Sequence, residues 1–211
     1  MIKNIIFDIG GVIADFDPIR VLHDMGLSEK QVQVIAKNTL LGPWWIELDR
    51  GVMSKEEVFA KMLGDLSKEM PDAIPIADKF LNEEIVKTVT SFDYSKNWLS
   101  DLKKRGYEIY LLTNYPGWLF DYHWEHTFSF TASVKGAFVS GKEKVIKPDD
   151  AIYQGILKRF DLTPSECVFL DDRIENVEGA KRNGINAIHF TSFEEASSEL
   201  ESVLDSDLSR A

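Results

Sequence analysis

The sequence has a single cysteine among its 211 residues, Cys167. One cysteine excludes an internal disulfide, and chains with so little cysteine are typical of reducing compartments. The neighbours of Cys167 in ECVFLDD are mostly apolar, so we expect this thiol to be a small buried strand residue rather than a reactive group.

Long hydrophobic runs are also missing from the sequence. The N-terminal MIKNIIFD contains an apolar run that is too short for a signal peptide or a membrane span. No later segment approaches the ~18 uninterrupted apolar residues that a spanning helix needs. These features predict a soluble, cytoplasmic protein with no membrane partner.

Positive charge is in deficit, with 24 Lys and Arg residues against 35 Asp and Glu residues and a formal net charge of −11. A surface of this sign repels nucleic acid and anionic membranes, so neither is an expected partner. A small anionic substrate would therefore need a local cationic or metal site.

Five short apolar runs rich in β-branched and aromatic residues indicate strands, and helical segments separate most of them. Runs of this kind are typical of strands that are covered on both faces. The alternation predicts an α/β fold with a doubly wound, mostly parallel, Rossmann-like sheet. The expected strands are Ile2–Asp8, Tyr107–Asn114, Gly136–Ser140, Cys167–Asp172 and Asn186–Phe190.

Between Asp17 and about Ser91 the pattern changes to helical periodicity, and no convincing strand is evident there. Ser54 and Glu57 have the spacing of a capping box at the start of one of these helices. We therefore expect an all-helical insertion after the first strand. The predicted division is a core of residues 1–16 and 92–211 and a helical unit of residues 17–91.

Polar residues follow three of the predicted strands, and Lys147 stands just before Pro148 at the expected start of a helix. Strand ends of a parallel sheet meet at one edge, so these side chains are expected to converge. Each residue alone has a plain structural explanation, since Asp8 and Thr113-Asn114 suit turns and a lone lysine suits the surface. The adjacent pair Asp171-Asp172 indicates more, because neighbouring carboxylates repel one another and need a cation or strong donors.

Four segments in this order resemble the motifs of the haloacid dehalogenase-like hydrolase superfamily: FDIGGV, LLTN, KPDDAIYQ and FLDDRIENVEGA. The insertion falls where that family carries a helical cap. The residues within these motifs are most similar to those of the branch that contains sugar-phosphate phosphatases and the phosphatase domain of soluble epoxide hydrolase. The resemblance therefore implies a phosphatase that acts on a small phosphorylated metabolite, with a sugar phosphate as one candidate.

The resemblance also implies roles for individual residues. Asp8 would be the nucleophile and would form an aspartyl-phosphate, with Lys147 as a cation beside it. The implied Mg²⁺ ligands are Asp8, the carbonyl of Gly10, and Asp171 and Asp172, with Asp172 as the direct ligand of the pair. The implied phosphate-binding residues are Gly10, Gly11, Thr113, Asn114 and Lys147, with the two glycines offering space and free N–H donors.

One departure from the family pattern concerns catalysis. The position two residues after the nucleophile normally carries a second Asp that acts as general acid, and here it is Gly10. General acid catalysis contributes ~10²–10⁴-fold, so the sequence predicts a preference for leaving groups that depart with little protonation. A dehalogenase that uses the same Asp8, and a non-catalytic binding protein, remain alternatives.

Substrate choice is expected to lie in the helical unit. Trp44, Trp45 and Glu47 in LGPWWIELDRG are candidates for substrate contact, although packing of the helices is the simpler explanation for the tryptophans. His123 and His126 lack a matched acidic ligand set, so we interpret them as packing or surface residues rather than a second metal site. The sequence names neither the substrate nor the oligomeric state.

Overall fold

The computed structural model describes residues 1–208 and contains a parallel sheet of five strands in the order β5-β4-β1-β6-β7. Each strand coincides with one of the five apolar runs, so the predicted sheet and its α/β class are confirmed. The strands are β1 Asn4–Phe7, β4 Glu108–Thr113, β5 Val134–Val139, β6 Cys167–Asp171 and β7 Asn186–His189.

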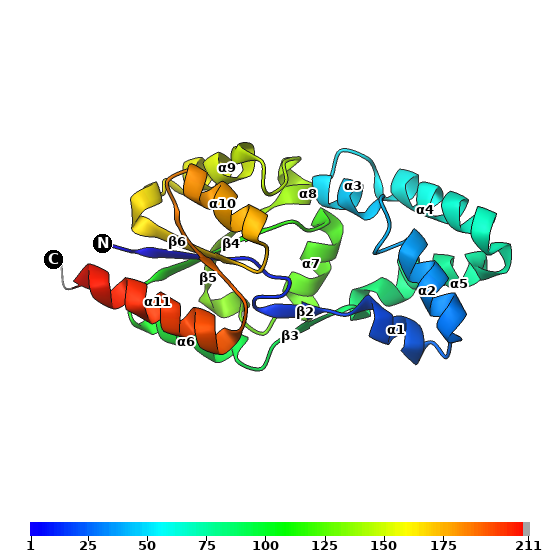
Figure 1. Cartoon of the computed structure of the whole chain (residues 1–211), viewed down its shortest axis with the longest axis horizontal. Coiled ribbons are helices and arrows are strands. Elements are labelled where there is room, and N and C mark those ends of the chain that lie inside the picture. Colours follow the sequence, from blue (N-terminus) through cyan, green and yellow to red (C-terminus); the bar gives the residue numbers. More distant parts are fainter. Residues whose placement is uncertain (209–211) are drawn as a thin grey trace.

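Apolar side chains cover both faces of this sheet, which explains why its strands read as continuous apolar runs. Ile5 and Phe7 of β1 point into one buried cluster, and Ile6 points into the other. Helices α9 Asp150–Phe160 and α10 Ile174–Arg182 cover one face, and α6 Ser95–Lys104 and α11 Phe193–Leu208 cover the other (Figure 1). The sheet is therefore doubly wound, and the expected small buried residue Cys167 lies in its core.

The remaining helices gather mostly beyond the end of the sheet where Asp8 lies. Helices α1 to α5 lie together at the right of Figure 1, and the capping box of Ser54 and Glu57 is present at the start of α4. The bounds are α1 Pro18–Asp24, α2 Glu29–Asn38, α3 Trp45–Arg50, α4 Lys55–Glu69 and α5 Ile74–Lys79, followed by single turns at Phe80–Glu84 and Ile85–Lys87. A short turn at Pro71–Ala73 joins α4 to α5. Elsewhere lie α7 Gly117–His126, α8 Ser140–Glu143 and short turns at Thr131–Ser133 and Pro164–Glu166.

A small second sheet of two strands, here called the ribbon, connects the five-stranded sheet to the group of helices α1 to α5. Strand β2, Ala14–Phe16, pairs antiparallel with β3, Val89–Ser91, so the chain enters and leaves the helical segment side by side. The expectation of no strand between Asp17 and about Ser91 is therefore wrong at β3, because a three-residue strand is too short to produce a recognisable alternation. The division into residues 1–16 with 92–211 and 17–91 stays a prediction, and its boundaries fall at this ribbon.

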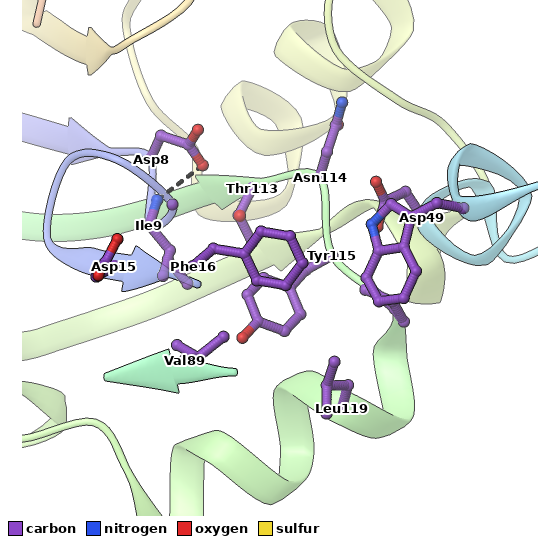
Figure 2. A pocket seen from close by; sticks show the side chains of 13 residues that line it. Asp8, Ile9, Asp15, Phe16, Asp49, Val89, Thr113, Asn114, Tyr115 and Leu119 are labelled. Carbon is purple, nitrogen blue, oxygen red and sulfur yellow. Dashed lines mark hydrogen bonds between the residues drawn. The ribbon is translucent and has the colours of Figure 1, made fainter. Parts of the chain in front are cut away.

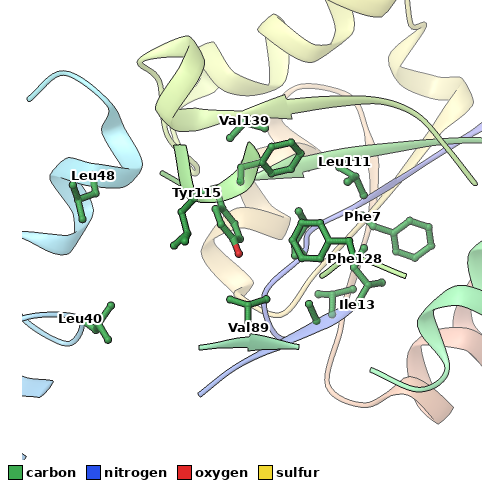
Figure 3. Packing of buried hydrophobic residues seen from close by; sticks show 14 of the residues in the cluster. Phe7, Ile13, Leu40, Leu48, Val89, Leu111, Tyr115, Phe128 and Val139 are labelled. Atoms are coloured by element: carbon green, nitrogen blue, oxygen red, sulfur yellow. The ribbon is translucent and has the colours of Figure 1, made fainter. Parts of the chain in front are cut away.

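One apolar cluster extends from the face of the sheet that α6 and α11 cover into the helical group. It includes Phe7 and Leu111 of the sheet, Val89 of the ribbon, and Leu40 and Leu48 among the helices (Figure 3). This continuity fixes the helical group relative to the sheet edge on which Asp8 lies. Among residues 1–208, no helix is both long and apolar enough to cross a membrane.

Candidate active site

Asp8 follows β1 directly and lies at the carboxyl edge of the sheet. Its N–H donates to the carbonyl of Leu170 at 2.9 Å, and its Oδ1 accepts from the N–H of Ile9 at 2.7 Å. The residue is only 7% exposed. Burial raises the pKa of Asp8 to about 7, while the attraction of Lys147 acts in the opposite direction. A buried carboxylate at this position needs cations around it to remain ionised.

Lys147 provides the cation within this site. Its Nζ lies 2.9 Å from Asp8 Oδ2 and 2.6 Å from Asp171 Oδ2, and it donates to the carbonyl of Leu112 at 3.0 Å. The residue is 3% exposed, so the interpretation as a surface lysine is wrong. Burial alone would lower the pKa of Lys147, but the two carboxylates raise it above its usual range, so the ammonium stays charged.

Asn114 positions the backbone of Lys147. Its amide Nδ2 donates to the carbonyl of Lys147 at 3.1 Å, and its Oδ1 accepts from the N–H of Lys147 at 2.8 Å. Pro148 comes next, and α9 begins only at Asp150, so the expected helix start at Pro148 is wrong. Thr113 is buried at the end of β4 and lines the same pocket as Asp8 and Asn114. Substrate contacts from Thr113 and Asn114 stay predictions.

Three carboxylates form a cluster at this edge: Asp8, Asp171 and Asp172 each offer an oxygen, and these oxygens all lie within 4.8 Å of one another. Asp171 is fully buried, and its oxygens accept from Lys147, from the N–H of Arg173 and from the amide of Asn176. Asp172 is more open, and burial followed by repulsion from Asp171 raises its pKa. An all-oxygen cluster of this kind fits a hard divalent cation such as Mg²⁺.

The two glycines after Ile9 differ sharply. Gly11 has φ +71°, and a Cβ there would lie 2.6 Å from Asp172 Oδ2, so a side chain at this position would strain the backbone and displace Asp172. The N–H of Gly11 donates to the carbonyl of Ala14 at 2.9 Å, so the expectation that it is a free donor is wrong. At Gly10 a Cβ would meet no atom within 4 Å, and its φ lies outside the left-handed region.

A pocket of about 130 Å³ opens over Asp8 and is shared by the sheet edge and the helical group (Figure 2). Phe16 and Val89 of the ribbon, Leu119 of α7 and Trp45 of α3 provide apolar walls, and the rings of Phe16 and Trp45 are 5.8 Å apart. Trp44 instead donates its indole N–H to Asp65 at 2.8 Å within the helical group. Glu47 pairs with Arg50 at 3.6 Å and is not among the residues that line the pocket.

Asp49 of α3 also lines this pocket, and sequence reasoning missed it. Its Oδ1 is buried and has no hydrogen-bond partner in the described part of the chain. Burial raises the pKa of Asp49 to about 8, and repulsion from Asp8 adds to the rise. The one feature of the sequence that points to Asp49 is its place in ELDRG, two residues after Glu47, a candidate for substrate contact.

His123 and Tyr115 form a buried pair beside the pocket. The carbonyl of Val86 lies 2.8 Å from His123 Nε2 and can only accept, so this nitrogen carries the proton. His123 Nδ1 then accepts from the hydroxyl of Tyr115 at 2.6 Å. Burial lowers the pKa of His123, which keeps the ring neutral. The pair joins the sheet edge to the turn that precedes β3, and His126 lies outside it near the surface.

Comparisons with known proteins agree with this geometry. The family described as haloacid dehalogenase-like hydrolase matches residues 2–184. A sesquiterpene phosphatase of Aspergillus oryzae is 27% identical over 190 residues, which cover 90% of each chain. A D-ribitol-5-phosphate phosphatase of Bacteroides thetaiotaomicron is 28% identical over 197 residues, which cover 87% of this chain and 89% of that protein.

A solved structure of similar fold is that of a haloacid dehalogenase-family enzyme from Bacteroides thetaiotaomicron in complex with magnesium and inorganic phosphate. It is 21% identical, has a TM-score of 0.67, and the match covers 90% of this chain and 94% of that one. At this identity the likeness shows the fold. The chain belongs to the haloacid dehalogenase-like hydrolases, and its relatives assign it to the phosphoric monoester hydrolases of that family.

Proposed function

We propose that this protein is a Mg²⁺-dependent phosphatase that hydrolyses a small phosphate monoester, with a sugar phosphate as one candidate, through an aspartyl-phosphate on Asp8. The observation that carries the proposal is the cluster at the sheet edge. One buried lysine joins Asp8 to Asp171, and the oxygens of Asp8, Asp171 and Asp172 converge within 4.8 Å.

Asp8, Asp172 and the carbonyl of Gly10 would hold the Mg²⁺, with Asp171 behind them. Asp171 suits a supporting place because its oxygens already accept from Lys147, Arg173 and Asn176. The cation neutralises phosphate charge when bound.

The chain's own residues then account for the covalent step. An Asp8 carboxylate oxygen attacks phosphorus, the bond from phosphorus to the leaving oxygen breaks, and water later cleaves the aspartyl-phosphate to regenerate Asp8. Lys147 keeps the nucleophile ionised and places positive charge beside the phosphoryl group. The small pocket with apolar walls favours a compact substrate, and its carboxylates can accept hydrogen bonds from hydroxyl groups.

Release of phosphate from p-nitrophenyl phosphate tests this proposal, measured with Mg²⁺ and again after EDTA. We expect activity with Mg²⁺ and none in chelator. The dehalogenase alternative predicts chloride release from 2-chloropropionate that persists in EDTA. A non-catalytic protein would release neither product in either condition.

A further inference from the structure

Gly10 leaves the site without an acid at the position where this family carries one, so a carboxyl group that protonates the leaving group would have to reach the pocket from elsewhere in the chain. Among residues 1–208, the pocket is lined by two carboxylates besides Asp8: Asp15 and Asp49. Asp15 is exposed on β2, whereas Asp49 presents a buried, unpartnered Oδ1. Tyr115 is not an alternative proton donor, because its hydroxyl already donates to His123.

The position of Asp49 is fixed by contacts of α3 with the sheet edge. Ser140 Oγ donates to the carbonyl of Asp49 at 2.6 Å and accepts from the N–H of Tyr115 at 2.9 Å, so one hydroxyl links Asp49 to the end of β4. Gly51, with φ +67°, closes α3 against α8, and a Cβ there would lie 2.0 Å from the carbonyl oxygen of Gly141. The helix therefore docks by backbone contact, with little freedom to shift.

Asp8 and Asp49 stand on opposite sides of the pocket (Figure 2). Phosphoryl transfer places the attacking and leaving oxygens roughly in line on either side of phosphorus. A phosphoryl group over Asp8 would therefore direct its leaving oxygen toward the side on which Asp49 lies.

We propose that Asp49 is the general acid and base of this enzyme and replaces the carboxyl group that Gly10 lacks. The inference rests on the proposed phosphatase function. When Asp8 attacks phosphorus and the bond to the leaving oxygen breaks, the Asp49 carboxyl gives its proton to that oxygen, and the alcohol departs. The Asp49 carboxylate then takes a proton from the water that attacks the aspartyl-phosphate. Asp8 is regenerated, Asp49 is protonated again, and hydrogen phosphate is released.

The electrostatic surroundings of Asp49 agree with this role. The charged groups that act on it are Asp8, which disfavours its ionisation, and Lys147 and Arg173, which favour it. Burial, together with the repulsion from Asp8, outweighs the two cations and raises the pKa of Asp49 to about 8, so the protonated form predominates near neutral pH. A carboxyl group with a pKa near the working pH is suited to both giving and taking a proton.

Asp49→Asn tests the inference, because it removes the proton at nearly constant shape. The assay compares p-nitrophenyl phosphate, whose leaving group departs without protonation, with propyl phosphate, whose leaving group requires it. We expect kcat/KM, which covers only the steps up to departure of the leaving group, to fall by ~100-fold more for propyl phosphate than for p-nitrophenyl phosphate, the low end for a general acid. A merely structural role of Asp49 would lower kcat/KM for both substrates by one common factor, and that result would overturn the inference.

Two further variants make the test specific. Asp15→Asn is the matched control, since it neutralises the other carboxylate of the pocket, and it should change both substrates by the same factor. If Asp15→Asn shows the differential loss instead, Asp15 is the acid and the assignment to Asp49 is wrong. In the Asp49→Asn background, Gly10→Asp should recover propyl phosphate hydrolysis at least tenfold, because a Cβ at position 10 meets no atom within 4 Å.

The assay also separates the two proposals. If the unmodified protein releases no phosphate from either substrate with Mg²⁺, the proposed function fails and the role of Asp49 fails with it. If the unmodified protein is active and Asp49→Asn lowers kcat/KM equally for both substrates, the phosphatase stands and the acid lies elsewhere.

Discussion

Asn114 and Lys147 form a closed pair of hydrogen bonds, with the amide of Asn114 donating to the carbonyl of Lys147 at 3.1 Å and the N–H of Lys147 donating back at 2.8 Å. The pair joins the end of β4 to the segment before α9. Through it, Asn114 orients the lysine that contacts the nucleophile, while its expected contact with phosphate stays a prediction. The geometry therefore favours a positioning role for Asn114.

Asn114→Ala should lower kcat for p-nitrophenyl phosphate by ~10–100-fold with little change in KM, because a small displacement of Lys147 weakens its contact with Asp8. Steady-state kinetics with saturating Mg²⁺ measure this split. A rise in KM with kcat preserved would show that Asn114 binds substrate directly, as the sequence first indicated.

Lys147→Met removes the cation between Asp8 and Asp171, whose oxygens it approaches to 2.9 and 2.6 Å. Leaving buried charge unpaired costs about 3–5 kcal/mol of unfolding free energy. If the acidic cluster binds Mg²⁺, saturating Mg²⁺ should restore part of this loss by replacing the missing charge. Chemical denaturation with and without Mg²⁺ measures both effects.

Lys142→Met is the control for that experiment, because Lys142 is an exposed lysine paired with Asp121 at the surface. Its effect should stay within about 0.5 kcal/mol in both conditions. An equal loss for Lys147→Met with and without Mg²⁺ would argue against a cation at the cluster.

The two neighbouring glycines should respond differently to alanine. Gly11→Ala places a Cβ in the left-handed region, at a cost of about 1–2 kcal/mol, and drives it against Asp172 Oδ2 at 2.6 Å. Gly10→Ala has open space and should leave the melting temperature nearly unchanged. Thermal melting of both variants decides the point, and equal destabilisation would contradict the account of this turn.

Trp44 and Trp45 offer a test of substrate choice by the helical group. Trp45 lines the pocket against Phe16, whereas Trp44 is held by Asp65 away from it. Trp45→Ala should therefore reorder a panel of phosphorylated metabolites while Mg²⁺-dependent turnover of a small aryl phosphate continues. Trp44→Ala should keep the original ranking. If both variants keep it, the helical group does not select substrate through Trp45.

Much of the fold could be predicted because the sheet strands are buried on both faces and therefore have a distinct composition. Asp8 and Asp171 could be found because each directly follows such a run. The role of Asn114 could not be found, since its partner is a backbone group brought near by folding. Asp49 was missed for a similar reason. Its place over the pocket depends on how Gly51 and Gly141 pack, and a six-residue helix gives no periodic signal of that contact.

The central claim is that Asp8 becomes phosphorylated, and chemical trapping measures this most directly. The protein is mixed with p-nitrophenyl phosphate and Mg²⁺, quenched in acid during turnover and treated with borohydride, which reduces an aspartyl-phosphate to homoserine. Peptide mass spectrometry should then find homoserine at position 8, and not in a sample treated without substrate. Continued phosphate release with an unmodified Asp8, or with homoserine at another aspartate, would contradict the account.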